Sequence, residues 1–369
     1  MSNREHHPLS GPDEKTLLLA WGALARNQWL LVPTEAGYVL AGDARLELPQ
    51  SWRIDEAQPG WCWAIAVRGA LHAFDWAPGA SASARRLMRK CWPNPLVIEL
   101  PCDHGLAHRL PATNRRGFFA QGRLALWAPR HPWLQRLLDH VDRPLVLGWR
   151  RSQVAATLQD VPSSIAERIA VAIDAGASPY RQTPTWVRLD AHTVHVVQAG
   201  AFPEEALEQA QRQVIVFVCT GNTCRSPMAE ALCKKMLAEH FACSEAELVQ
   251  RGWEICSAGI AAGYGWPASA EAVRVVGSLK ASLEHHSSQP VVPALLGRAD
   301  RIYTMTRAHL AALQDIGGRL LVHAELLSPE GLDIADPLGA DEEVYRHCAL
   351  YIQQCLRARL NEWLRSASD

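Results

Sequence analysis

The stretch VIVFVCTGNTCRSPMAEAL, at Val214–Leu232, carries most of the information on the fold of this 369-residue chain. An apolar run ends at Val218, and Pro227 opens an amphipathic segment, since proline is favoured at the first position of a helix. We therefore predict a strand over 214–218 and a helix that begins near Pro227, with Ser226 as its N-cap. The loop between them gathers backbone N–H groups at a helix N-terminus, an arrangement that binds anions.

Strand and helix patterns alternate after residue 213, as is typical of a parallel sheet covered on both faces. A helix is predicted after the loop, because Met228, Leu232 and Met236 recur on one side of it. Further apolar runs predict three more strands, at Trp253–Gly259, Arg301–Met305 and Arg319–Ala324. We therefore expect an α/β fold with a four-stranded parallel sheet in the second half of the chain.

The C-terminal segment predicts a long helix that packs on this sheet. Asp341 is expected to cap it, with Glu342 and Glu343 in a first turn where carboxylates favour the helix dipole. Its buried stripe is predicted to consist of Val344, Tyr351, Cys355, Leu360 and Trp363.

Length and composition indicate two globular domains, since single cores seldom grow much past ~250 residues. Hydrophobic residues make up 48% of the chain and charged residues 20%, and a net charge of -1 gives no field that attracts nucleic acid or anionic membrane. No window approaches the ~20 apolar residues of a membrane span, and the polar N-terminus lacks a signal-peptide pattern. We therefore expect a cytoplasmic protein without membrane contact, whose 10 cysteines are mostly buried thiols.

The loop over 219–225 contains the residue types of a reaction centre. Arg225 lies six residues after Cys219, and its planar guanidinium offers a pair of donors to phosphate oxygens. The positive environment at the helix start favours the thiolate form of Cys219, which is the nucleophilic form. The residues predicted to bind the substrate's phosphoryl group are Thr220, Gly221, Asn222, Thr223, Cys224 and Ser226.

A structural interpretation of this loop stands beside the functional one. A Cys-x5-Arg string also occurs by chance, and a cysteine in such a chain is usually a small buried hydrophobic residue. The strand before the loop, the Gly-Asn pair within it and the Ser-Pro pair after it favour a functional phosphate loop.

The leaving group of such a reaction needs a proton. A carboxylic acid outside the loop must supply it and then act as base toward the hydrolytic water. The segment LDIADPLGAD offers Asp333 and Asp336. We favour Asp336, because Pro337 stiffens the turn that presents it.

The motif VCTGNTCRSPMAE, at Val218–Glu230, with a distant Asp-Pro pair resembles the low-molecular-weight protein-tyrosine-phosphatase family. The resemblance covers about 213–364 and includes SAG at Ser257–Gly259 and HHSS at His285–Ser288. It implies the fold of that family and a reaction that needs no metal and no cofactor.

The resemblance also implies a role for each residue of the loop. Cys219 would carry a phosphocysteine intermediate, Arg225 would bind the transition state, and Asp336 would act as general acid and base. Asn222 would shape the loop, and the Ser226 hydroxyl would support the thiolate.

Three positions are more similar to the bacterial protein arginine phosphatase branch than to tyrosine-specific members. The latter tend to carry an aliphatic residue at the position of Thr223 and aromatic residues where this chain has Leu338 and Gly339. The resemblance implies that the threonine hydroxyl helps to select a phosphoramidate. The expected partner is therefore a phosphorylated protein or peptide, with phosphotyrosine and phosphoarginine both open.

Two further alternatives concern redox chemistry. Arsenate reductases share this fold but need two more cysteines farther downstream, and the region of Val291 and Arg298 has no such pair. That function is therefore a minor alternative. Cys224 either forms a reversible disulfide with Cys219 or only packs the loop.

The first half of the chain is rich in tryptophan, and all but three of the 14 tryptophans lie there and are expected to pack in its core. Five segments in this half resemble a YrdC-like domain, the fold of threonylcarbamoyl-adenylate synthases. The resemblance implies a twisted α/β sheet with a basic concavity, and a nucleotide or double-stranded RNA as partner. The segments are Leu30–Ala44, Cys91–Leu100, Leu124–Pro132, Arg143–Arg151 and Thr183–Glu205.

The departures from that family concern the groups that hold its substrates. Its Ser-x-Asn pair falls at Trp149 and Arg151, and two of its arginines become Trp127 and Gln198. No Lys-x-Arg pair follows LAGDA, whereas the Pro-Thr-Glu motif survives at 33–35. Bulky indoles are expected to fill the cavity, so we expect a domain that is not a synthase.

These interpretations divide the chain into a polar tail over 1–14, a degenerate YrdC-like domain over 15–205, a linker over 206–212 and a phosphatase domain over 213–366. The leading hypothesis is a cysteine-dependent protein phosphatase with a non-catalytic partner domain. The alternatives are a nucleotide- or tRNA-linked binding module with an accessory phosphatase, and a scaffold in which neither half turns over.

Overall fold

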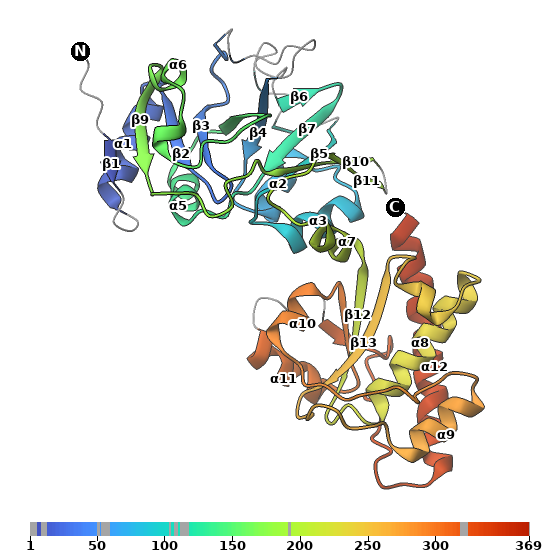
Figure 1. Cartoon of the computed structure of the whole chain (residues 1–369). Coiled ribbons are helices and arrows are strands. Elements are labelled where there is room, and N and C mark those ends of the chain that lie inside the picture. The colour runs from blue at the N-terminus through green and yellow to red at the C-terminus, as the bar shows by residue number, and fades with distance from the viewer. Residues whose placement is uncertain are drawn as a thin grey trace. The chain divides into compact units, whose positions relative to one another are not determined.

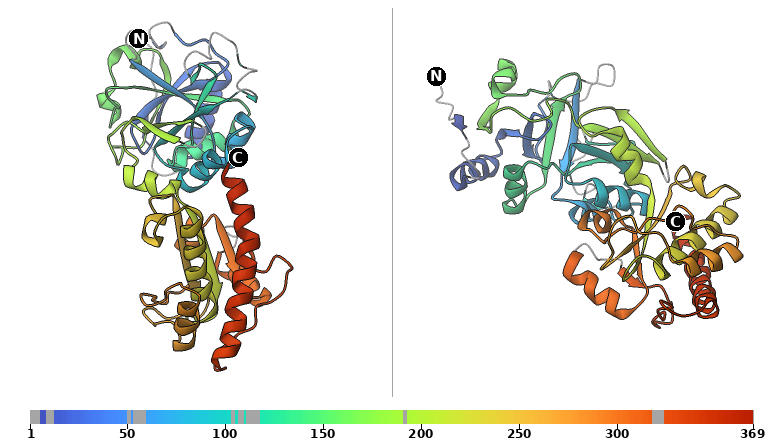
Figure 2. Two further views of the ribbon diagram at one scale, coloured as in Figure 1. Left: turned by 90° about the vertical axis from the view of Figure 1, so that its right-hand side faces the viewer. Right: turned by 60° about the horizontal axis from the view of Figure 1, so that its bottom comes forward.

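The computed structural model describes residues 6–8, 13–49, 52, 60–102, 105–106, 110, 118–190, 193–317 and 324–368. The chain separates into two compact units, 1–210 and 211–369, which are both drawn in Figures 1 and 2. Within the described residues, no helix combines the length and the apolar character needed to cross a bilayer.

The first unit is built on a mixed sheet of 11 strands in the order β1-β9-β2-β3-β8-β4-β7-β5-β10-β11, with β6 paired to β7. Some of its strand pairs are parallel and others are antiparallel. The α/β sheet predicted for this half of the chain is confirmed. The strands are β1 His6–Pro8, β2 Trp29–Pro33, β3 Tyr38–Asp43, β4 Trp61–Ala66, β5 Leu96–Pro101, β6 Phe119–Ala120, β7 Arg123–Trp127, β8 Leu145–Arg150, β9 Ile169–Asp174, β10 Thr185–Asp190 and β11 Thr193–Gln198. The helices are α1 Glu14–Ala25, α2 Ala70–Trp76, α3 Ala82–Cys91, α5 Pro132–His140, α6 Ser163–Ala166 and α7 Glu204–Gln211.

Two hydrophobic cores lie on opposite faces of this sheet, because neighbouring strand residues point to opposite sides. Leu30 and Val32 pack with α1 and α5, whereas Trp29 and Leu31 belong to a core that includes α2 and α3. Ten of the first-half tryptophans are buried and only Trp21 is exposed, so the predicted core role of these residues is confirmed except at Trp21.

Helix α7 occupies most of the predicted linker. Its Leu207 and Ala210 are buried in the core of the first unit, so this segment is a packed helix and not a free connector. The first strand of the second unit begins at Gln213, two residues after α7 ends.

The second unit contains a four-stranded sheet in the order β13-β12-β14-β15, and all of its pairs are parallel, as predicted. Figure 1 shows α10 and α11 on one face and α8, α9 and α12 on the other. Phe217 points into the core with α8, α9 and α12, and Val216 into the core with α10 and α11. The elements are β12 Gln213–Cys219, α8 Arg225–His240, β13 Trp253–Gly259, α9 Ala270–Ser278, α10 Pro293–Arg298, β14 Arg301–Thr304, α11 Arg307–Gly317, β15 Ala324–Leu326 and α12 Glu342–Ser368.

Three of the four predicted strands agree with β12, β13 and β14, and the fourth prediction does not match β15. Most of the strand predicted at 319–324 lies outside the described residues, and the observed fourth strand, β15, begins at Ala324.

The start of α8 differs from the prediction by two residues. The helix begins at Arg225 and Cys224 takes the N-cap position, so Ser226 is not the cap. Asn222 already has a positive φ of 56°, which turns the chain into the helix early. Pro227 is tolerated at the third helical position, because the first N–H groups of a helix have no partner within it.

The cap of α12 is as predicted, and of its predicted buried stripe only Val344 is wrong, since Tyr351 and Leu360 pack partly buried against the core. Asp341 Oδ1 accepts hydrogen bonds from the backbone N–H groups of Glu343 and Val344, both at 3.1 Å. The Val344 side chain is exposed, and its neighbour Tyr345 is buried in its place. Cys355 and Trp363 are buried as predicted.

Candidate active site

Cys219 is the last residue of β12. In the sheet, β12 lies between β13 and β14. This is the point where the strand order of an open parallel sheet reverses, and ligands of such sheets bind beyond the carboxyl ends of the strands there. The loop over 220–224 connects this strand end to the N-terminus of α8. The predicted loop therefore lies at the edge of the sheet where a site is expected.

The Cys219 sulfur is buried and surrounded by hydrogen-bonding groups. The Ser226 hydroxyl lies 2.9 Å from Sγ, and the backbone N–H of Asn222 donates to Sγ at 3.3 Å. Two groups that can donate hydrogen bonds therefore lie next to this sulfur. The structure thus brings Ser226 to the sulfur even though Ser226 does not cap the helix.

Asn222 holds the loop in shape from within. It is completely buried, and its Nδ2 donates to the Ser226 and Ser257 hydroxyls at 3.0 and 2.8 Å. Its Oδ1 accepts from the backbone N–H of Gln289 at 2.9 Å, and its backbone oxygen lies 2.8 Å from Nε2 of His286. With all of these groups bonded, the positive φ of Asn222 is held by its surroundings.

Gly259, at the end of β13, allows the loop to lie directly against the neighbouring strand. A Cβ at this position would lie 2.5 Å from the Thr220 carbonyl oxygen and 2.9 Å from the Asn222 nitrogen. Any larger residue would therefore push the loop away from the sheet.

Arg225 enters the site from the first turn of α8 and is almost fully buried. Its Nη1 donates to the Ile334 carbonyl at 3.1 Å, and its Nη2 forms an ion pair with Oδ2 of Asp336. Its Nε is buried and has no hydrogen-bond partner among the described residues. A buried donor of this kind is suited to an anionic oxygen.

The two candidate acids differ in what they contact. The Asp336 side chain is 42% exposed and reaches Arg225, and the N–H of Leu338 donates to its other oxygen at 3.2 Å. Asp333 instead accepts from the backbone N–H of Arg307, at the start of α11. The structure therefore places Asp336 in the site and Asp333 beside it.

The remaining loop residues differ in exposure. Gly221 and Thr223 are partly exposed, and Cys224 is buried with its Sγ 3.2 Å from the Tyr345 hydroxyl. Burial, with the Cys224 contact, raises the pKa of Tyr345 to about 12. Cys224 is a free thiol that contacts α12, which fits its packing role.

His309 was not among the predicted site residues, yet it contacts the loop. Its Nε2 lies 2.9 Å from the Thr220 hydroxyl and its Nδ1 lies 2.9 Å from the Thr306 hydroxyl. Burial and the nearby Arg225 charge lower its pKa. Its position one turn after the carboxyl end of β14 is the only sequence signal that indicates it.

Residues 214–367 match the family model for low molecular weight phosphotyrosine protein phosphatase. The protein-arginine-phosphatase of Bacillus subtilis (strain 168) is 33% identical over 147 residues, which are 39% of this chain and 91% of that protein. The chain belongs to this phosphatase family. The low molecular weight protein-tyrosine-phosphatase PtpB of Staphylococcus haemolyticus is 34% identical over 139 residues, covering 36% of this chain and 86% of that protein. The solved YwlE arginine phosphatase from Geobacillus stearothermophilus is 31% identical, with 42% of this chain and 94% of that one covered and a TM-score of 0.36.

The phosphatase unit offers no sign of a metal centre in the part of the chain that the structure describes. There, no three His, Cys, Asp or Glu side chains are grouped as ligands.

Residues 22–200 match a second family model, that of Sua5, YciO and YrdC, described as telomere recombination. Trp127 and Trp149, where the sequence resemblance predicts that substrate-binding groups of that family are lost, are buried indoles. The rings of Trp127 and Trp149 lie 5.4 Å apart, and those of Trp149 and Trp186 lie 5.8 Å apart. Gln198 donates to the Arg151 carbonyl at 3.2 Å.

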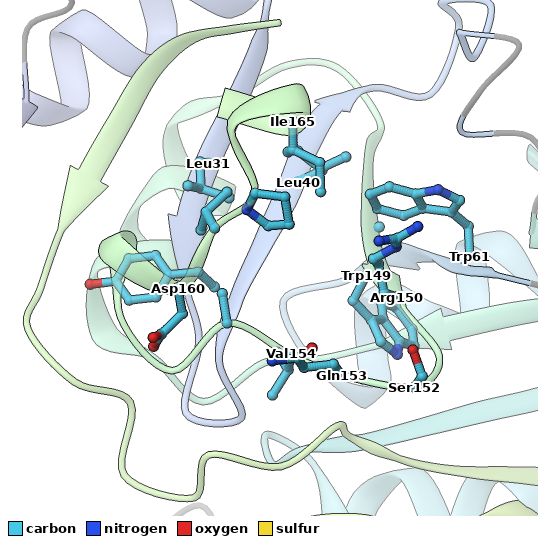
Figure 3. Close-up of a pocket in the computed structure, with 15 residues that line it drawn as sticks. Leu31, Leu40, Trp61, Trp149, Arg150, Ser152, Gln153, Val154, Asp160 and Ile165 are labelled. Carbon is cyan, nitrogen blue, oxygen red and sulfur yellow. The ribbon is translucent and has the colours of Figure 1, made fainter. Parts of the chain in front are cut away.

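A small pocket of about 80 Å³ lies against the same strands in the first unit. Figure 3 shows Arg150 beside the Trp61 ring on one side and Leu31, Leu40 and Ile165 on the other. The Arg150 guanidinium carbon lies 5.9 Å from the Trp61 ring centroid, which is a cation–π contact.

The surviving Pro-Thr-Glu motif has structural contacts. The Thr34 hydroxyl donates to the Gly37 carbonyl at 2.6 Å within a turn. One oxygen of Glu35 accepts from the backbone N–H groups of Arg130 and His131, at 2.8 and 3.1 Å. Burial raises the pKa of Glu35. Thr34 and Oε2 of Glu35 thus have partners within the protein, whereas Oε1 of Glu35 is buried without a hydrogen-bond partner among the described residues.

Proposed function

We propose that this protein hydrolyses phosphorylated proteins or peptides through a phosphocysteine intermediate on Cys219. The observation that carries this proposal is the convergence of three groups on one loop. The Cys219 sulfur, the buried Nε of Arg225 and the half-exposed carboxylate of Asp336 all meet at the carboxyl end of β12. These are the nucleophile, the oxyanion donor and the proton donor that phosphoryl transfer to sulfur requires.

The reaction follows in two steps. When the phosphoryl group takes the place of Asp336 on Arg225, the freed carboxylate takes up a proton from solvent. The thiolate then attacks phosphorus while the bond to the leaving oxygen or nitrogen breaks, and Asp336 gives this proton to the leaving atom. A water molecule then attacks the phosphorus and loses a proton to Asp336 as the S–P bond breaks. Phosphate leaves and the thiolate is restored. Arg225 and the loop N–H groups stabilise the charge on the non-bridging oxygens in both steps.

The substrate class follows from the wall of the loop. Thr223 is partly exposed, and Leu338, two residues after Asp336, is 69% exposed and takes the place of an aromatic ring. A hydroxyl at Thr223 is a hydrogen-bond acceptor for the guanidinium of phosphoarginine. Relatives of this chain bear both protein-arginine-phosphatase and protein-tyrosine-phosphatase names. We therefore favour phosphoarginine and keep phosphotyrosine as the alternative.

The test of the mechanism is Cys219→Ser. The variant is expected to lose turnover of an aryl phosphate at an unchanged melting temperature, and vanadate is expected to inhibit the wild-type protein. Cys243→Ser is the matched control, because Cys243 is a half-buried thiol outside the site. Turnover by Cys219→Ser at the wild-type rate would exclude the intermediate.

We further infer that the first unit is not a threonylcarbamoyl-adenylate synthase and acts as a non-catalytic partner. The support is the packing of Trp127 and Trp149 at positions where that family holds its substrates. Filling a site with indoles removes the volume and the charge that a triphosphate needs. Calorimetric titration of the full chain with ATP and with threonine is expected to give no binding heat.

The alternative function is a nucleotide- or tRNA-linked binding module with an accessory phosphatase. The match of residues 22–200 to the Sua5, YciO and YrdC model favours it. Saturable heat with both ATP and threonine in the same titration would support this alternative against the non-catalytic role.

A further inference from the structure

The first turn of α11 contacts both loops of the site. In the nucleophile loop, Thr220 directly follows Cys219, and its hydroxyl lies 2.9 Å from Nε2 of His309. In the other loop, Asp333 Oδ1 accepts from the Arg307 N–H at 2.9 Å. Just before the helix, the Met305 carbonyl accepts from the Ile334 N–H at 2.8 Å. One rigid turn therefore joins the nucleophile loop to the segment that carries Asp336.

The hydrogen bonds of His309 have a consistent direction. A neutral imidazole has one donor and one acceptor nitrogen. The Thr306 hydroxyl oxygen accepts the His309 backbone N–H at 3.3 Å, which leaves its hydrogen available for Nδ1 at 2.9 Å. In the tautomer that we assign from this arrangement, Nε2 carries the proton and donates to Thr220. His309 is buried, with 7% of the residue exposed.

Arg225 makes the second link between the same two loops, through Ile334 and Asp336. This link weakens in the reaction, because a phosphoryl group that binds Nε and Nη2 competes with the Asp336 carboxylate for the guanidinium. The link through α11 joins the His309 ring to the Thr220 hydroxyl and uses no atom of Arg225. It therefore persists while Arg225 is engaged.

We propose that His309 is a positioning residue that holds the nucleophile loop at a fixed distance from the segment bearing Asp336. The proposal rests on the phosphatase function proposed above. It acts through Thr220, which is exposed and follows Cys219 directly. Small displacements of reacting groups reduce the rate of a step far more than they weaken substrate binding.

The test compares Thr220→Val, which removes the hydroxyl at nearly constant size, with Thr220→Ser, which keeps it. Thr220→Val is expected to lower kcat about fivefold, the rate equivalent of one neutral hydrogen bond, with KM nearly unchanged. Thr220→Ser keeps the hydroxyl that bonds to His309, so its kcat is expected to be about fivefold higher than that of Thr220→Val. Because Thr220 is exposed, both variants are expected to fold, and thermal unfolding checks this.

His309→Gln completes a double-mutant cycle with Thr220→Val. If both residues act through their mutual bond, the double variant is expected to be no slower than the slower single variant. His347→Gln is the matched control, since His347 is exposed on α12. If His309→Gln does not fold, the comparison of Thr220→Val with Thr220→Ser tests the proposal by itself.

Equal kcat for Thr220→Val and wild type, or losses that add in the double variant, would overturn the proposal. The same assays distinguish failure of this positioning role from failure of the proposed phosphatase function. If the phosphatase function is wrong, the wild-type protein shows no turnover, or Cys219→Ser retains turnover.

Discussion

Arg225 and Asp336 form an ion pair across the mouth of the site, with the guanidinium Nη2 donating to the carboxylate Oδ2. The two partners differ in environment, because the Arg225 side chain is 5% exposed and that of Asp336 is 42% exposed. In the proposed reaction, a phosphoryl group that binds Arg225 competes with this carboxylate for the guanidinium. We therefore expect the ion pair to keep the proposed acid close to Arg225 until substrate binds.

Asp336→Asn tests this role. The amide keeps an oxygen for Arg225 but has no proton to give, so kcat for a poor leaving group is expected to fall by about 100-fold. A leaving group that is stable as an anion needs no proton, and its kcat is expected to change little. The measurement is kcat across aryl phosphates of graded leaving-group basicity.

Asp333→Asn is the matched control, since an amide oxygen can still accept from the Arg307 N–H. Its rates are expected to stay near those of the wild type across the same series. A uniform loss for all leaving groups in Asp336→Asn would contradict the role of proton donor.

Thr223→Val tests the substrate preference. The replacement keeps the size of the side chain and removes the hydroxyl that we expect to accept from the substrate guanidinium. The ratio of kcat/KM for phosphoarginine over phosphotyrosine peptides is expected to fall by about tenfold, the value of one hydrogen bond to a charged group. If the ratio is the same in variant and wild type, Thr223 does not set the preference.

Gly259→Ala tests the close approach of the loop to β13. The added Cβ would lie 2.5 Å from the Thr220 carbonyl oxygen, so the nucleophile loop must shift. Overpacking of this kind costs about 1–3 kcal/mol of unfolding free energy. We expect a lower melting temperature and a loss of turnover together.

The control for this substitution is Gly277→Ala in α9, where an added Cβ meets nothing within 4 Å. Alanine favours helix over glycine by about 1 kcal/mol, so this variant is expected to be as stable as the wild type or more stable. A Gly259→Ala protein with the stability and rate of Gly277→Ala would contradict the steric argument.

The sheet of the second unit was predictable because its signals are local. Val214–Val218 and Trp253–Gly259 are apolar runs bounded by turn residues, and burial on both faces of a parallel sheet requires such runs. Cys219, Arg225 and Asn222 were found because the loop that unites them is continuous in sequence.

Contacts between distant segments were less predictable. At the start of the buried stripe of α12 we predicted Val344, but Tyr345 is buried there instead, and its hydroxyl lies 3.2 Å from the Cys224 sulfur. His309 was missed for the same kind of reason, since its partner Thr220 lies 89 residues away in the chain. Neither contact leaves a periodic signal in sequence. The position of the cap of α8 depended on the φ of Asn222, which is set by partners such as Ser257 and Gln289.

Glu35 makes the stability of the first unit depend on pH. Burial raises its pKa in the folded protein, so the neutral form is favoured by folding. Its contribution to stability is therefore fully present below the pKa of the unfolded chain and is lost as pH rises through the raised folded value. Glu35→Gln stays neutral throughout. The unfolding free energy of the wild type relative to this variant is expected to decrease as pH rises from about 4 to 8.

Chemical denaturation followed by tryptophan fluorescence measures this difference in the first unit, because all but three of the 14 tryptophans lie there. Glu167→Gln is the matched control, since Glu167 is exposed, and its difference from wild type is expected to be flat with pH. A difference between wild type and Glu35→Gln that is also flat, or that increases with pH, would show that the Glu35 carboxyl is stabilised as the anion. The backbone N–H groups of Arg130 and His131 would then outweigh the cost of burial.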